Sequence, residues 1–172
     1  MNLSEKILDV PDFPEPGVVF KDITPLLGSA AHFSAAVDGL AASAPADVDV
    51  VVGMEARGFI FAAPVALRLG AGFVPVRKPG KLPGDVYSQS FDLEYGKETL
   101  TVHRNAIERG ARVLVIDDVL ATGGTVAATA GLLHQLGADL VHVAVLLELQ
   151  ALGGRAVLAE QGIASLTSLV QH

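Results

Sequence analysis

Short apolar runs alternate with stretches of helical apolar spacing along most of the chain. Runs typical of buried strands occupy residues 49–53, 73–77, 98–103, 113–116, 140–147 and 164–169. Helical spacing is found at residues 29–44, 57–69 and 125–136, with shorter helical stretches at 4–10 and 153–162. A parallel strand reads as a continuous apolar run because both of its faces are covered. The alternation therefore predicts an α/β fold, with a mainly parallel twisted sheet flanked by helices.

Two longer segments lack this regularity. Residues 11–25 contain four prolines, which predicts an irregular segment with Phe20 and Lys21 on an ordered loop. Residues 78–96 are rich in glycine, proline and polar residues. A long irregular stretch usually carries function or is disordered, and this composition suits a mobile cover over a site. No repeat or linker divides the chain, so we expect a single domain over residues 1–172.

The composition indicates a soluble intracellular protein. The longest apolar run, residues 140–149, contains His142 and Glu148 and is too short to cross a bilayer. The first ten residues are polar and acidic at intervals, unlike a secretory signal. The chain has no cysteine, which excludes disulfides and thiolate metal sites. We therefore expect a cytoplasmic protein with no membrane partner.

Charge is distributed unevenly along the sequence. The formal net charge is −7, which argues against nucleic acid as a partner because a nucleic-acid binder needs a basic face. Arg77, Lys78 and Lys81 nevertheless form a local cationic cluster among prolines and glycines. The cluster suits a site for an anionic small molecule, and a solvated turn explains it equally well.

The most informative motif follows the apolar run at residues 113–116. Asp117 and Asp118 come next, at the expected carboxyl edge of the sheet, where open α/β folds bind ligands. A turn of small and hydroxyl residues then leads into the next helix: Ala121, Thr122, Gly123, Gly124 and Thr125. Its amides and the helix N-terminus could hold a phosphate. The order predicts a ligand with hydroxyls and phosphate, with a divalent metal.

An ordinary Asp-Asp turn before a helix is the simpler interpretation of each part of this motif. The complete thirteen-residue order favours the ligand site, because several requirements are met together. The motif is not a Walker-type loop, since no Gly-Lys-Ser/Thr follows its glycines.

Five segments together resemble the adenine phosphoribosyltransferases, over nearly the whole chain. They are Gly-Val-Val-Phe-Lys-Asp-Ile-Thr-Pro at 17–25, Gly-Met-Glu-Ala-Arg-Gly-Phe at 53–59, Val-Pro-Val-Arg-Lys-Pro-Gly-Lys-Leu-Pro at 74–83, Leu-Glu-Tyr-Gly at 93–96, and the motif at 113–125. The last is shared in looser form by type I phosphoribosyltransferases generally. The first two segments and the Ala-Thr-Gly-Gly-Thr turn are similar to the adenine branch.

The resemblance implies a purine salvage enzyme that converts adenine and 5-phosphoribosyl 1-pyrophosphate (PRPP) to AMP and pyrophosphate. It also implies Mg²⁺ bound mainly through PRPP or pyrophosphate, and a homodimer that takes these small molecules as its substrates. In the fold, it implies a small base-binding hood at about residues 1–28 and a flexible active-site loop at about residues 78–96.

The resemblance also implies the roles of individual residues. Glu94 handles the proton on the reacting purine, and Arg57 faces the pyrophosphate. PRPP or AMP is bound by Asp117, Asp118, Ala121, Thr122, Gly123, Gly124, Thr125, Arg77, Lys78 and Lys81. Adenine is bound by Val19, Phe20 and Lys21, with Phe20 as the stacking surface. Arg77 is expected to reach into the partner subunit's site.

Some of these roles depend wholly on the resemblance. Without it, Phe20 is better explained as a core residue and Glu94 as one more exposed acid. Lys21 stands where relatives often have arginine, and Glu55–Ala56 is our candidate for the cis peptide that the family often has. The five histidines share no metal-ligand spacing, so we predict no metal-ligating residue, and His142 is expected in the core.

Two other functions stay open on the sequence. A phosphoribosyltransferase for an oxopurine needs a donor for the exocyclic oxygen, often a lysine near a late strand end, but after Leu146 the chain offers Glu148 and Gln150. A PRPP-binding transcriptional sensor needs a basic surface or a DNA-binding domain, and neither is evident. Glu94 also fits an enzyme better than a sensor.

Overall fold

A five-stranded parallel sheet organises the computed structural model, which describes residues 1–172. Its strand order is β4-β3-β7-β8-β9. The strands are β3 (Val50–Met54), β4 (Gly72–Val76), β7 (Arg112–Leu120), β8 (Asp139–Glu148) and β9 (Leu166–Gln171). Because β7 lies between β3 and β8, the segment that follows it leaves the sheet near its centre. The predicted parallel α/β fold is confirmed.

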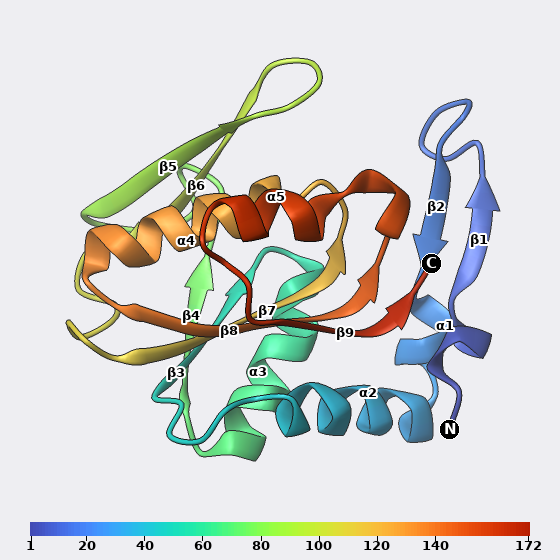
Figure 1. The fold of residues 1–172 in the computed structure, drawn as a ribbon, viewed down its shortest axis with the longest axis horizontal. Coiled ribbons are helices and arrows are strands. Elements are labelled where there is room, and N and C mark those ends of the chain that lie inside the picture. The colour runs from blue at the N-terminus through green and yellow to red at the C-terminus, as the bar shows by residue number, and fades with distance from the viewer.

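Helices cover both faces of this sheet (Figure 1). One face carries α2 (Ala30–Ala42) and α3 (Arg57–Leu69), and the other carries α4 (Gly124–Leu136) and α5 (Gly154–Glu160). Successive residues of β7 point to opposite faces of the sheet and so pack against different helix layers. Val113 and Val115 belong to the core beneath α4, whereas Leu114 and Ile116 belong to the core beneath α2 and α3.

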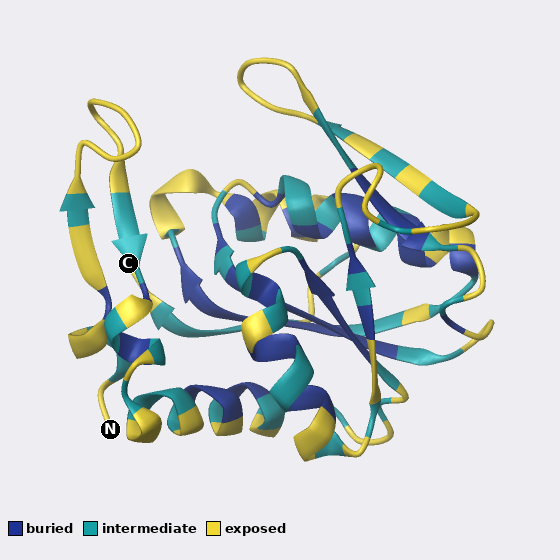
Figure 2. Ribbon diagram, turned by 180° about the vertical axis from the view of Figure 1, so that it is seen from behind, coloured by how far each residue is buried: buried dark blue, intermediate teal, exposed yellow.

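Two antiparallel strand pairs stand outside the main sheet. They are β1 (Leu8–Pro11) with β2 (Val19–Asp22), and β5 (Val86–Asp92) with β6 (Lys97–His103). Three short elements complete the chain: the 3₁₀ turns η1 (Leu3–Lys6) and η2 (Gln150–Leu152), and α1 (Thr24–Leu27). Figure 2 shows that both pairs are far more exposed than the central strands.

The structure corrects three sequence predictions. The expected helix at residues 4–10 is wrong, because a 3₁₀ turn ends at Lys6 and β1 follows. The segments at 11–25 and 78–96 are not wholly irregular, since they contain β2 and β5. Four-residue or exposed strands bury too little apolar surface to show a clear period. Their partner strands define them instead.

Other expectations agree more closely with the structure. Helix α3 has the predicted bounds, and the strand expected at 98–103 exists. It pairs with β5 and reaches the main sheet through a single antiparallel bridge from Thr101 to Arg77, the residue that follows β4. No helix in the structure is long and apolar enough to cross a membrane.

Candidate active site

The two carboxylates of the central motif lie inside β7. The strand continues to Leu120, so the expectation that it ends before Asp117 is wrong. Both aspartates are buried. Asp117 Oδ1 accepts a hydrogen bond of 2.9 Å from the amide of Asp118. Burial, and the negative charge of Asp118 beside it, raise the pKa of Asp117 well above its usual range.

Glycine at position 58 makes room for this pair. A Cβ atom at Gly58, in the first turn of α3, would lie 2.8 Å from Asp117 Oδ1. Any side chain there would displace the carboxylate. Packing against Asp117 therefore explains the glycine of the Arg-Gly-Phe sequence at the start of α3.

A small cavity joins Asp117 to the turn that follows the strand. Its volume is about 60 Å³, and it is lined by Asp117, Val119, Leu120, Ala121, Thr122, Gly123, Gly124, Thr125 and Val126. Gly123 has φ of +91°, a conformation that favours glycine, and α4 begins at the next residue. The unpaired amides at the start of this 13-residue helix give the turn a positive end. The predicted phosphate-binding turn thus lies beside a buried carboxylate.

Arg57, the first residue of α3, connects the carboxylates to the N-terminal strand β2. Its Nε lies 2.6 Å from Asp118 Oδ2, and its guanidinium lies 5.1 Å from the ring centroid of Phe20. Its NH1 group donates a hydrogen bond of 3.5 Å to the carbonyl of Lys21. The sequence predicted only that Arg57 faces pyrophosphate; the contacts with Phe20 and Asp118 are a finding of the structure.

The three residues predicted to bind the base lie together on β2. The Phe20 ring is half-buried and packs edge-on against Phe13, with ring centroids 5.2 Å apart. Val19 is exposed, and Lys21 Nζ lies 2.6 Å from Asp9 Oδ1 on β1. Phe20 is therefore not the core residue that the simpler interpretation required.

The cationic cluster after β4 gathers around Glu55, at the end of β3. Lys81 Nζ lies 2.5 Å and Arg77 Nε 3.4 Å from the Glu55 carboxylate, which also accepts a 2.7 Å hydrogen bond from the amide of Lys78. The Lys78 ammonium pairs with Glu98 at 3.1 Å. Burial acts to raise the pKa of Glu55, but the hydrogen bonds from Lys81 and Lys78 outweigh it and hold the pKa below its usual value. The cluster is thus a built loop and not a freely solvated turn.

Sequence and structure comparisons agree on one family. Residues 25–157 match the phosphoribosyl transferase domain. An adenine phosphoribosyltransferase from Cutibacterium acnes is 65% identical over 168 residues, which are 98% of this chain and 95% of the relative. The chain belongs to the adenine phosphoribosyltransferases.

Solved structures of adenine phosphoribosyltransferases share this fold. That from Thermoanaerobacter pseudethanolicus has a TM-score of 0.94 at 44% identity and covers 99% of this chain and 100% of its own. The Giardia lamblia enzyme, solved with 9-deazaadenine, has a TM-score of 0.93 at 38% identity and covers 100% and 98%. The expected fold, family and enzyme class are confirmed.

Glu94 is the one predicted catalytic residue that the structure leaves apart from the others. It lies in the exposed loop between β5 and β6, which a hydrogen bond of 2.9 Å from the Leu93 amide to the Gly96 carbonyl closes. Figure 1 shows this loop and the β1–β2 pair as separate projections. Near this loop, Phe91 packs against the start of α4, since a Cβ atom at Gly124 would lie 2.7 Å from its ring.

Two further sequence expectations agree with the structure, and one residue was missed. The Glu55–Ala56 peptide is cis, as expected. His142 is buried between the hydroxyls of Ser165 and Thr167, at 2.7 and 2.9 Å, so both of its ring nitrogens have partners. Sequence reasoning missed Glu55 as the organiser of the cationic loop, although its place directly after a buried strand was a usable signal.

Proposed function

We propose that the enzyme joins adenine to the ribose 5-phosphate of PRPP, releasing pyrophosphate, at the carboxyl edge of its five-stranded sheet. One observation carries this proposal: Arg57 contacts both the aromatic ring of Phe20 and the carboxylate of Asp118. A base-stacking surface and a hydroxyl-binding carboxylate thereby flank a single guanidinium. Substitution at the anomeric carbon needs such alignment more than it needs covalent help.

In this proposal the sugar phosphate lies along β7 and the turn after it. The amides and hydroxyls of residues 121–125 hold the 5′-phosphate, while Asp117 and Asp118 receive hydrogen bonds from the ribose hydroxyls. Asp118 Oδ2 supports this role, because it is buried and has an ion-pair partner but no hydrogen-bond donor. Lys78, Lys81 and Arg77 place positive charge where pyrophosphate leaves.

The donor set fits Mg²⁺ held mainly by the substrate. No group of three or more acidic or histidine side chains forms a protein cage for a metal, whereas Asp117 and the undonated Asp118 Oδ2 offer the hard oxygens that Mg²⁺ or its waters prefer. When bound through PRPP, the ion would screen the charge of the leaving pyrophosphate. The chain's own contribution is to orient the sugar and hold these oxygens in place.

The base half of the proposed site belongs to β2, within a hood at about residues 1–28. Phe20 stacks on adenine, and the backbone of Val19 and Lys21 contacts the base edge. Glu94 then exchanges a proton with the purine once the hairpin loop covers the site. The exposed position of Glu94 supports a role for movement of the loop within residues 78–96.

We further propose a cytoplasmic homodimer without nucleic-acid or membrane partners. Strand β4 is an edge of the sheet, and with α3 it exposes Ile60, Leu67 and Phe73, of which Leu67 is 83% exposed. A second copy covering this face would place Arg77 near the partner's site. Light scattering on wild type and on Leu67→Glu tests the dimer, and cell fractionation tests the location.

A spectrophotometric assay tests the function itself. Adenine, hypoxanthine, guanine and xanthine are each supplied with PRPP and Mg²⁺, and nucleotide formation is followed. We expect turnover with adenine alone. Turnover confined to an oxopurine would overturn the base assignment, and binding of PRPP without turnover of any base would favour a sensor.

A further inference from the structure

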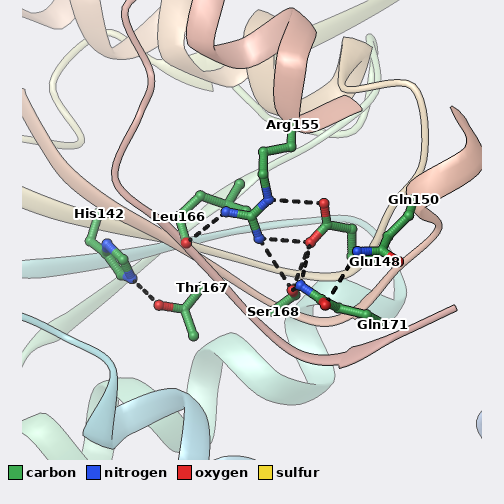
Figure 3. Close-up of polar contacts among 8 residues, drawn as sticks. All are labelled: His142, Glu148, Gln150, Arg155, Leu166, Thr167, Ser168 and Gln171. Carbon is green, nitrogen blue, oxygen red and sulfur yellow. Dashed lines mark hydrogen bonds and ion pairs between the residues drawn. The ribbon is translucent and has the colours of Figure 1, made fainter. Parts of the chain in front are cut away.

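A polar network at the end of β8 lies outside the residues assigned above. Glu148 is the last residue of β8, and its side chain is 5% exposed. Its carboxylate accepts hydrogen bonds from Arg155 Nε and NH2, at 3.0 and 2.7 Å, and from the Ser168 hydroxyl at 2.7 Å (Figure 3). A buried carboxylate with this many donors is ionised, and the pKa of Glu148 is lowered, chiefly by Arg155.

Arg155 ties one short helix to two strands. It lies in the first turn of α5, and besides Glu148 on β8 its NH1 group donates a 3.1 Å hydrogen bond to the carbonyl of Leu166 on β9. Its NH2 group also donates to the Ser168 hydroxyl at 3.3 Å. A planar guanidinium with several fixed donors can make these contacts together, and a lysine ammonium cannot reproduce them.

The residue just before Arg155 touches the phosphate-binding turn. Gly154 is buried, and a Cβ atom there would collide with the Ala121 carbonyl and lie 3.1 Å from the Gly123 amide nitrogen. The approach is mutual, since a Cβ atom at Gly123 would lie 3.1 Å from the Gly154 carbonyl oxygen. The backbone of α5 therefore forms a wall behind the turn.

The opposite side of the same junction is also fixed. The Leu149 amide, one residue after Glu148, donates a 2.9 Å hydrogen bond to the Leu120 carbonyl, the last residue before the turn. The turn is thus held at its start by the end of β8 and from behind by α5. Glu148 and Arg155 join these two supports.

We propose that Glu148 and Arg155 are positioning residues for the 5′-phosphate: their ion pair holds Gly154 against the turn at residues 121–125 and so sets the spacing of its amides. This inference rests on the proposed function, because it assigns the turn to the phosphate of PRPP and AMP. Neither residue touches the substrate. A shift of about 1 Å in a positioned site can cost about a hundredfold.

Loss of the ion pair should disturb mainly the residues around Glu148, because the two side chains differ in burial. Glu148 is almost fully buried while the Arg155 side chain is 43% exposed. Removing the arginine leaves a buried carboxylate that keeps the Ser168 hydroxyl but has lost its opposite charge. The carboxylate, one residue before the Leu149 amide that holds Leu120, must then either draw in water or move. Both responses displace the contact between Gly154 and the turn.

The test is steady-state kinetics of Arg155→Met, Arg155→Lys and Gly154→Ala, with Arg112→Met as control. Arg112 also donates two hydrogen bonds to backbone carbonyls, of Asp47 and Ala46 at 3.1 and 3.2 Å, but at the start of β7, the opposite end from the turn. We expect the Arg155 and Gly154 variants to raise the KM for PRPP about 10- to 100-fold. The KM for adenine should stay unchanged, and Arg112→Met should alter neither KM.

Calorimetric binding of AMP and adenosine separates positioning from mere folding. The positioning role predicts that folded Arg155→Met loses affinity for AMP but not for adenosine. The ratio of AMP affinity to adenosine affinity, which measures the contribution of the 5′-phosphate, should therefore fall. If folded Arg155→Met keeps the wild-type KM for PRPP and the wild-type preference for AMP, the inference is wrong whatever Gly154→Ala does, because that variant disturbs the turn by direct collision. If the wild type neither uses adenine nor binds AMP, the proposed function fails instead.

Discussion

Replacing Phe20 by leucine tests the adenine site most directly. Leucine keeps an apolar side chain on β2, so the strand pairing with β1 should persist. The substitution removes the aromatic face proposed to stack on the base, and with it the ring that lies 5.1 Å from the Arg57 guanidinium. The perturbation therefore removes base recognition while the carboxylates and the phosphate-binding turn stay in place.

The expected loss follows from the energy of stacking. A base on an aromatic side chain contributes about 1–3 kcal/mol, and every 1.4 kcal/mol is about a tenfold change in binding. The KM for adenine should therefore rise about 5- to 140-fold. The KM for PRPP should change far less, because Phe20 makes no contact with the turn and reaches the carboxylates only through Arg57, whose ion pair with Asp118 persists.

Two further variants sharpen the assay, which measures both KM values spectrophotometrically. Phe13→Leu removes the edge-on partner that lies 5.2 Å from Phe20 but leaves the stacking face, so the KM for adenine should stay within about twofold. Phe20→Tyr keeps the ring and should bind adenine nearly as the wild type does. An unchanged KM for adenine in folded Phe20→Leu would refute stacking by this residue.

Four other outcomes follow from the site and its electrostatics. Asp118→Ala should abolish turnover, and near-normal kcat/KM would remove the carboxylate from ribose binding. Glu94→Ala should lower kcat about a hundredfold with a smaller change in the KM for adenine, and unchanged kcat would exclude it from proton transfer. Asp117→Asn should raise the thermal midpoint at pH 7 and impair PRPP binding. The fold raises the pKa of Asp117, so ionisation of this carboxyl at neutral pH opposes folding, and the asparagine removes that cost. A lower thermal midpoint would contradict this account of the buried charge. Burial lowers the pKa of His142, so below about pH 6.5 the unfolded state binds a proton that the folded state resists. Stability should therefore fall as the pH drops below about 6.5. Calorimetric scans of His142→Gln should show a weaker dependence of the thermal midpoint on pH.

Local sequence patterns predicted the main sheet and its helices. Apolar runs such as residues 113–116 are continuous because both faces of a central parallel strand are covered. The bounds of α3 were predictable from its apolar spacing and the left-handed glycine at position 70 that ends it. The weakly patterned strands β1, β2 and β5 were not predictable, because their stability depends on partners rather than on a buried face.

The sequence by itself determined which chemical groups the site contains. The motif at 113–125 predicted two carboxylates followed by a phosphate-binding turn, and the resemblance of the segment around Phe20 to the adenine phosphoribosyltransferases predicted a base-binding role. These assignments need only the order of residues along the chain.

Only the tertiary structure decided how these groups meet. Arg57 lies 36 positions along the chain from Lys21, the nearest residue of β2 that it contacts. Glu148 and Arg155 lie beside a turn that precedes them by more than twenty positions. Such contacts depend on which strands are neighbours in the sheet, and strand order is not written in any local pattern. The physical reason is that burial and long-range packing, not neighbouring residues, fix the spacing of charges at the sheet's carboxyl edge.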